Sequence, residues 1–321
     1  MNMREKLENH QVIVYGISIV LAVVYGLIFP HIAMNFDQLL SVVMGILMYG
    51  MFSQIPFTSV KKGMLNRRFL CALLIANYIA VPVVVFFLTH LFSIESHLLL
   101  GVCLVLLAPC IDYVIVFTAL GKGDAKQMLL ATPLLLVTQL FVLPFYLTLF
   151  LGKEAASLID MTPFIKTFLL LIVVPLVAAI FFQLLARRQQ TAQKWLDLSA
   201  WLPVPFMALT LFIIIASQIH SLQAYKMELL HVLPVYMLFM VIMPFVSKWI
   251  ATLFRLPIPL GRALLFSSST RNSLVVLPLA FALPAPFQLL VAAVIVTQTI
   301  VEMIGELLYI RLVPNVWFKN S

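Results

Sequence analysis

Charged side chains are scarce in this sequence. Asp, Glu, Lys and Arg together make up 10% of its 321 residues, whereas an average soluble domain carries about a quarter. No polar stretch is long enough to form a separate water-soluble domain, and the mean hydropathy is +1.11. The shortage of charge excludes an ordinary globular protein and predicts an all-α polytopic membrane protein embedded in the lipid bilayer.

The sequence also lacks the residue sets that most catalytic and metal sites need. Its three cysteines, an odd number, all fall in apolar runs, which argues against a disulfide framework. Its six histidines lie near the ends of these runs or in loops, without the paired spacing of metal ligands. No credible set of nucleophile, base and acid is present. We therefore expect no metal, no cofactor and no enzymatic activity.

Apolar runs of about 20 residues recur from end to end, each long enough to cross the roughly 30 Å hydrocarbon core of a bilayer. Backbone groups in lipid must be paired internally, and barrel-like alternation is missing, so these runs are predicted to be helices. The first run resembles a signal peptide but lacks a convincing cleavage site, and we expect it to be retained. The ten predicted spans lie near residues 11–33, 38–56, 69–93, 96–120, 127–152, 162–186, 199–220, 229–253, 261–283 and 287–312.

The basic residues predict how these spans are oriented. With ten spans, 16 of the 20 Lys and Arg residues fall on the side shared by both termini and 3 on the other, and Arg271 lies within a span. The excess of positive charge marks the cytoplasmic side, so both termini are predicted to be cytoplasmic in a multi-pass protein of the cell (inner) membrane. The net charge of +8 is explained by this excess, and no nucleic-acid partner is expected.

Three ionisable residues are predicted to lie deep in the bilayer: Asp112 in span four, Arg271 in span nine and Glu302 in span ten. Each costs roughly 2.5–3.5 kcal/mol on insertion scales, and such residues usually face a bundle interior or an aqueous cavity. At about 1.5 Å per helical residue, all three fall near one plane. This shared depth predicts a polar site, although a single Asp–Arg pair that fixes helix packing is the alternative. Glu306 is expected to lie nearer the cytoplasmic end and to reach water.

Two spans are interrupted in the same way. Span four reads LLAPCIDYVIVFTALGKGD, with Pro109 directly before its polar residues, and span nine reads LLFSSSTRNSLVVLP, with seven consecutive polar residues at 267–273. They are the fourth spans of two five-span halves, residues 1–155 and 156–321. Because five is odd, the second half must insert upside down. We therefore predict two inverted repeats with broken, crossing helices four and nine, as in many secondary transporters.

These stretches resemble a known family. PCIDYVIVFTALGKGD is similar to the fourth-helix signature of the arsenical-resistance exporters, a branch of the bile acid/arsenite/riboflavin transporter superfamily. Cys110, Ile111, Val114 and the Gly-Lys-Gly-Asp ending at 121–124 match, whereas Asp112 replaces a small residue. Supporting matches are NYIAVP at 77–82, SSTRNS in span nine, and IVEM, which places Glu302 where the exporters carry a glutamate.

The resemblance also exposes a departure. Sodium-coupled symporters of this superfamily bind sodium beside both crossovers, through Ser-Asn in helix four and Glu and Gln in helix nine. The corresponding positions here hold Val114, Ile115, Ser267 and Arg271. Hard cations need oxygen ligands, which Val and Ile side chains do not supply. We interpret Arg271 as a fixed positive charge that takes the place of sodium, and expect sodium-independent transport.

Two functions follow as expectations. The first is a secondary active antiporter that exports arsenite or a related metalloid oxyacid, with Cys110 as a soft ligand and protons as the coupling ion. The second is a bile acid symporter-like carrier of small organic anions, with Arg271 binding a carboxylate. A non-transporting receptor or an intramembrane enzyme is disfavoured, because neither a soluble domain nor a catalytic set is present. The predicted substrate-binding residues are Asn77, Cys110, Asp112, Arg271 and Asn272, and the predicted coupling residues are Asp112 and Glu302.

The cysteine and the two asparagines among these residues each have a simpler interpretation. A free cysteine packs like a small hydrophobic residue, so Cys110 could be a filler. Cys103, seven residues earlier, is expected on the same helical face and is more typical of a filler still. Asn77 and Asn272 could serve only to bridge helices.

Overall fold

The computed structural model describes residues 10–29, 32, 37–54, 65–111, 114–157, 169–281 and 283–319. Within these ranges the regular structure consists of α-helices and short π-helical turns, without a strand. The chain divides into two compact units. Unit 1 comprises Met1–Ser59, Asp160–Lys226 and Phe281–Leu289, and unit 2 comprises Val60–Ile159, Met227–Ala280 and Leu290–Ser321.

Unit 1 is built around helix α13 (Pro203–Ala224), which packs against α2 (Gln11–Ile28) and α4 (Asp37–Gln54). Helix α11 (Val174–Ala186) follows the π-helical turn η3 (Leu169–Val173) and packs against α4. Its buried Gln183 side chain donates to the Phe52 carbonyl of α4 (3.3 Å). This bond joins α11 to α4 through a buried polar side chain.

One short helix of unit 1 was not expected from the sequence. Residues 190–199, taken as a loop between spans six and seven, form α12 (Gln190–Ser199), which packs against α11. The helix buries Ala192 and Ser199, which are two turns apart on one face, and exposes its charged residues. A search for long apolar runs does not detect such an amphipathic segment.

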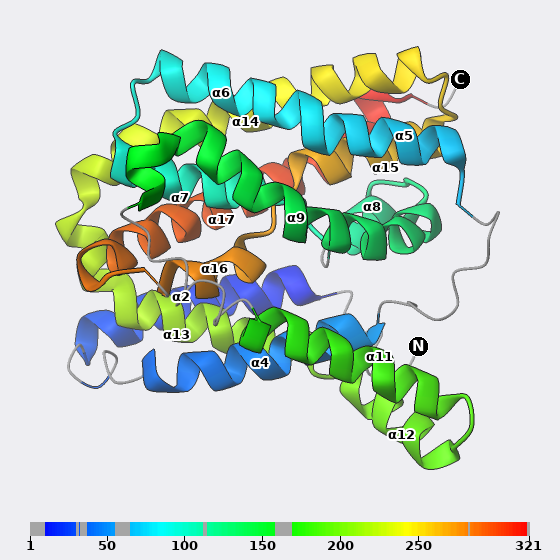
Figure 1. Cartoon of the computed structure of the whole chain (residues 1–321), viewed down its shortest axis with the longest axis horizontal. Coiled ribbons are helices and arrows are strands. Elements are labelled where there is room, and N and C mark those ends of the chain that lie inside the picture. Colours follow the sequence, from blue (N-terminus) through cyan, green and yellow to red (C-terminus); the bar gives the residue numbers. More distant parts are fainter. Residues whose placement is uncertain are drawn as a thin grey trace. The chain divides into compact units, whose positions relative to one another are not determined.

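Unit 2 contains the two interrupted spans. Helix α15 lies at its centre and packs against α5, α8, α9 and the π-helical turn η2. Helices α5 and α6 follow one another through η2 as one nearly continuous rod (Figure 1). The first residue of α14, the last of α16 and the first five of α17 belong to unit 1. The elements are α5 (Arg67–Ile75), η2 (Ala76–Ala80), α6 (Val81–Leu91), α7 (Ser96–Leu106), α8 (Val114–Leu120), α9 (Ala125–Ser157), α14 (Lys226–Leu253), α15 (Ile258–Ser269), α16 (Ser273–Phe281), α17 (Ala285–Leu312) and η4 (Val313–Trp317).

By length and composition, three helical stretches of the described chain can cross a membrane: Arg67–Leu91, Lys226–Leu253 and Phe287–Trp317. Two bent pairs bring the number to five, and they are Ala125–Gln139 with Phe141–Gly152 and Gln190–Ser199 with Pro203–Ser217. Spans four and nine fall short because each is split into two short halves. An all-helical membrane protein is therefore confirmed, and the count of ten spans stays a prediction.

Prolines inside the helices of unit 2 free backbone carbonyls, and tyrosines from other helices satisfy two of them. Pro82 has no N–H for the carbonyl of Tyr78, four residues earlier. The hydroxyl of Tyr146, on α9, donates to that carbonyl. The lost helical bond is thus replaced by a bond between helices.

The same device occurs in the second half of the chain. Pro244, inside α14, has no N–H for the carbonyl of Met240, again four residues earlier. The hydroxyl of Tyr309, on α17, donates to it. Membrane helices tolerate proline when neighbouring groups satisfy the freed carbonyl, and here one tyrosine does so in each half.

Candidate functional site

The two broken helices of unit 2 meet at their breaks. Residues 107–113 separate α7 from α8, and residues 270–272 separate α15 from α16. Pro109 and Arg271 form an isolated antiparallel bridge between the two breaks. Its backbone hydrogen bonds run from the Cys110 N–H to the Thr270 carbonyl (3.3 Å) and from the Asn272 N–H to the Ala108 carbonyl (2.9 Å). The predicted breaks in spans four and nine are thus present, and we call the paired segments the crossover.

Local chemistry explains why both helices stop here. Pro109 cannot donate a helical hydrogen bond, and a proline disfavours helical geometry in the residue before it. Thr270 has extended backbone angles and ends α15. Asn272 then starts α16, because its side-chain oxygen accepts from the Val275 N–H (3.1 Å), as an N-cap does. Extended backbone in the membrane must find partners, and the two breaks supply them to each other.

The side chain of Arg271 is completely buried at the crossover. Its guanidinium donates to the Asn77 side-chain oxygen (2.8 Å), the Ser267 carbonyl (2.7 Å) and the Leu106 carbonyl (3.3 Å). The ring of Phe239 lies 5.7 Å from the guanidinium carbon, within range of a cation–π contact. The positive charge is therefore surrounded by oxygen atoms and one aromatic face.

Two of these oxygens belong to helix ends. Leu106 is the last residue of α7, and Ser267 lies in the last turn of α15. Carbonyls in a last helical turn lack intrahelical partners and carry the negative end of the helix dipole. The C-terminal ends of two half-helices thus stabilise the buried guanidinium. Because backbone carbonyls provide this stabilisation, the pattern of side chains in the sequence does not predict it.

Asn77 connects the third predicted span to this centre. It lies on the π-helical turn η2, and its side-chain nitrogen donates to the Leu73 carbonyl (3.0 Å) and the Ser267 hydroxyl (3.2 Å). Its oxygen accepts from Arg271. π-Helical turns are often found at functional sites. Asn77 does bridge helices, as the simpler interpretation has it, and a role in substrate binding stays a prediction.

Two glutamates of α17 face the crossover. Glu302 accepts from the Arg271 backbone N–H (2.7 Å) and from the Gln298 side chain (2.5 Å). Glu306, one turn later, accepts from the Thr270 hydroxyl (3.0 Å). The expectation that Glu306 reaches water is wrong, because its side chain is completely buried. Sequence reasoning did not single out Gln298 and placed Glu306 outside the site, although their spacing of four residues from Glu302 puts all three on one helical face.

Cys110 lies within the crossover and is completely buried. The expected helical face shared with Cys103 is wrong, because α7 ends at Leu106 and Cys110 lies beyond it, in the break. Cys103 is buried on α7, Cys71 is exposed on α5, and all three thiols are free. Asp112 lies outside the described residues, so its predicted approach to Arg271 stays a prediction.

Several buried polar atoms around the crossover have no hydrogen-bond partner within the described part of the chain. They are Asn272 Nδ2, Ser273 Oγ, Gln298 Oε1 and Glu306 Oε2. Buried polar groups are almost always hydrogen-bonded, so these atoms mark places where water or a small ligand can bind. The set offers both donors and acceptors. Among the described residues, no three His, Cys, Asp or Glu side chains gather closely enough to hold a metal ion.

Comparison of the chain with known proteins places this site in a family. No match is found among curated proteins. A model of the Sodium Bile acid symporter family matches residues 41–225, which is more than half of the chain and includes the first broken helix. The chain therefore belongs to the sodium bile acid symporter family, a family of membrane transporters.

Proposed function

We propose that this protein is a secondary active transporter that exports arsenite or a related metalloid oxyacid without sodium. The observation that carries the proposal is the oxygen cage around Arg271. Carbonyl and amide oxygens from three separate elements surround its buried guanidinium. Such oxygens are the ligands that hard cations take. The arginine therefore supplies, as part of the chain, the positive charge that a bound sodium ion would otherwise bring to the crossover.

We propose further that ten spans form two inverted repeats, residues 1–155 and 156–321, with both termini in the cytoplasm. Equivalent positions of the halves support this, because residues with the same role recur at a nearly constant interval. The two prolines with tyrosine-satisfied carbonyls, Pro82 and Pro244, are 162 residues apart, as are the bridge partners Pro109 and Arg271. The two tyrosines, Tyr146 and Tyr309, are 163 apart. Apart from Phe281–Leu289, unit 1 draws on predicted spans one, two, six and seven, which are again equivalent positions of the halves.

The polar atoms at the crossover favour a small uncharged acid as substrate. Arsenite at neutral pH carries hydroxyl groups that both donate and accept hydrogen bonds. The unpartnered atoms of Asn272, Ser273, Gln298 and Glu306 offer this mixture. The Arg271 guanidinium already donates to three carbonyl and amide oxygens, which leaves it less suited to binding a substrate carboxylate. A carrier of small organic anions is the second candidate, and the family to which the chain belongs favours it.

Uptake into inside-out vesicles tests these functions directly. We expect arsenite to accumulate when a proton gradient is imposed, and small organic acids not to. Because Arg271 replaces the coupling cation, exchanging sodium for choline at constant pH should leave the initial rate nearly unchanged. Vesicles without the protein provide the baseline. A steep, saturable sodium dependence would contradict the role given to Arg271, and uptake of organic acids without arsenite would establish the second candidate.

Replacing Cys110 tests the metalloid itself. Trivalent arsenic binds thiolates, and Cys110 lies in the crossover beside the Thr270 carbonyl. We expect Cys110→Ser to reduce the arsenite export rate roughly tenfold, equivalent to about 1.4 kcal/mol. The buried Cys103→Ser and the exposed Cys71→Ser are matched controls and should retain export. Full arsenite export by well-inserted Cys110→Ser would reduce this cysteine to packing.

A further inference from the structure

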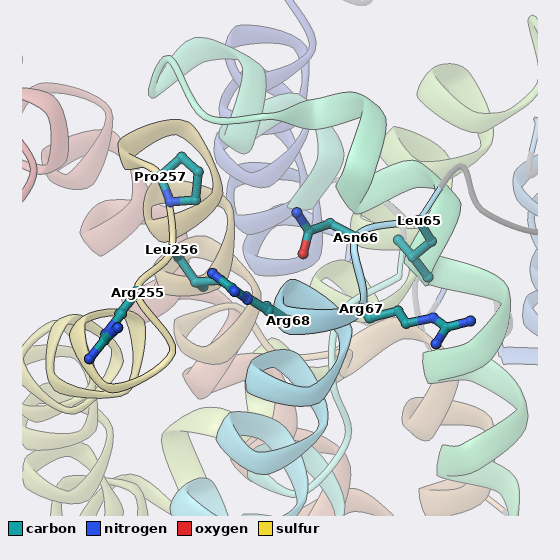
Figure 2. A pocket seen from close by; sticks show the side chains of 7 residues that line it. All are labelled: Leu65, Asn66, Arg67, Arg68, Arg255, Leu256 and Pro257. Carbon is teal, nitrogen blue, oxygen red and sulfur yellow. The ribbon is translucent and has the colours of Figure 1, made fainter.

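A basic pocket lies in unit 2 where helix α5 begins and the turn from α14 to α15 passes. Its volume is about 440 Å³, within the usual range for ligand pockets. One wall is Leu65 to Arg68, and the other is Arg255 to Pro257 (Figure 2). The first wall is fixed in place, because the Asn66 N–H donates to the Gln127 side chain of α9 (2.8 Å). The pocket is separate from the crossover residues described above.

Three of the seven lining residues are arginines and none is acidic. In Figure 2, Arg68 extends across the pocket toward Leu256, while Arg67 and Arg255 extend outward on opposite sides. Mutual repulsion favours such a spread, and an anion between the side chains would reverse it. Guanidinium groups are suited to phosphate, because they can donate two parallel hydrogen bonds to it.

The backbone of Arg255 has a conformation that disfavours most side chains. Its φ is 49°, in the left-handed region, and the turn is a Schellman motif closed by bonds from Arg255 N–H to Thr252 and from Leu256 N–H to Ala251. Glycine is the usual residue at this position, because a side chain there strains the backbone. Arg255 therefore occupies a position at which glycine would have the least backbone strain.

The adjoining helices put this pocket at the level of lipid headgroups. Arg67–Leu91 starts at the pocket and Lys226–Leu253 ends beside it, and both are long and apolar enough to cross a membrane. The positive-inside pattern assigns all three arginines to the cytoplasmic side. Trp249 and Leu253, on one face in the last turns of α14, are 68% and 63% exposed, which offers an apolar surface to acyl chains.

From this geometry we infer that the pocket binds the phosphate group of an anionic phospholipid in the cytoplasmic leaflet. Arg68 and Arg255 bind the phosphate from the two walls, and Arg67 adds to the positive potential. Each basic residue near a membrane surface strengthens attraction to anionic lipid by about 1 kcal/mol, so loss of two should weaken binding roughly 30-fold.

Native mass spectrometry of the full-length protein in detergent tests the site. Phosphatidylglycerol and phosphatidylcholine with identical acyl chains are titrated separately. We expect wild type to retain phosphatidylglycerol in preference to phosphatidylcholine. The double variant Arg68→Gln/Arg255→Gly should bind phosphatidylglycerol roughly 30-fold more weakly than wild type and so lose this preference. Arg255→Gly removes backbone strain, so the single variant should melt at the same or a higher temperature than wild type while it binds phosphatidylglycerol more weakly. A loss of binding that followed from misfolding would not show this combination.

Lys122→Gly is the matched control. Lys122 also has a left-handed φ, of 58°, on the same predicted side, but it lines a different basic pocket, with Arg262 and Lys319. It should keep wild-type lipid preference. Equal retention of phosphatidylglycerol by the double variant and wild type would overturn the inference, as would an equal loss in Lys122→Gly, which would reduce the effect to overall charge. Tight binding of inorganic phosphate without preference for phosphatidylglycerol would overturn the lipid assignment.

Discussion

Replacement of Arg271 with methionine should abolish transport and lower the free energy of unfolding by about 3–5 kcal/mol. Methionine occupies much of the same volume but leaves the oxygens of Leu106, Ser267 and Asn77 without their charged donor. It also removes the charge that stabilises the carbonyl ends of α7 and α15. Melting temperature in detergent measures the loss of stability, and arsenite uptake per folded molecule measures the loss of transport.

The chain contains a matched control for this experiment. Arg262 lies nine residues earlier, on α15, is 2% exposed, and also donates to backbone carbonyls. Its partners are the carbonyls of Phe318 (2.6 Å) and Lys122 (3.0 Å), away from the crossover. Arg262→Met should therefore lose stability but retain transport per folded molecule. Transport by folded Arg271→Met at the wild-type rate would reduce Arg271 to a packing residue.

A smaller side chain at the same position tests whether the cage is a cation site. Arg271→Ser removes the guanidinium and leaves the oxygens of Leu106, Ser267 and Asn77. Sodium should then raise the melting temperature of this variant relative to choline at equal ionic strength, while wild type should melt at the same temperature in both salts. Equal melting of Arg271→Ser in the two salts would mean that these oxygens do not form a cation site.

Hydropathy predicts much of this fold because a membrane protein must hide its backbone within helices. The bounds of α5 to α6, α14 and α17 agree with predicted spans to within a few residues. The breaks were also predictable, since Pro109 and the polar run at 267–273 both oppose a continuous apolar helix. Helix α12 was not, because its apolar face is too short to stand out from a polar sequence.

The candidate site could be predicted only in part from the sequence, for a different reason. Rarity in an apolar sequence singles out Arg271 and Glu302, and the cost of burial implies partners near by. Two of the partners are backbone carbonyls at helix ends, which every residue type possesses. Glu302 was expected near Arg271 as a coupling group, and its described bond there is with the Arg271 backbone N–H. Residue type alone does not indicate which atom of Arg271 meets which neighbour.

That bond links the break between α15 and α16 directly to a carboxylate of α17. Glu302 is 1% exposed, and one of its oxygens accepts from both Arg271 and Gln298. Thr270, the preceding residue of the break, is bound by Glu306 one turn away. Two carboxyl groups at i and i+4 on one helix repel when both are charged, so a proton on one of them relieves the repulsion. The crossover therefore has a place for a proton beside the segment that joins two half-helices.

We accordingly expect Glu302→Gln to lose proton-driven accumulation of substrate while it still exchanges substrate across the membrane. Glutamine keeps an oxygen that can accept from the Arg271 N–H and the Gln298 side chain, so the crossover geometry is retained while the ability to bind and release a proton is lost. Counterflow in vesicles measures exchange, and uptake under an imposed pH gradient measures coupling; we expect near-normal counterflow and at least a tenfold loss of gradient-driven uptake. Glu306→Gln is the matched control one turn away, since its oxygen can still accept from Thr270. Uncoupling by Glu306→Gln alone would show that Glu306, and not Glu302, binds the coupling proton. Normal gradient-driven accumulation by well-folded Glu302→Gln would refute the role of Glu302 in coupling.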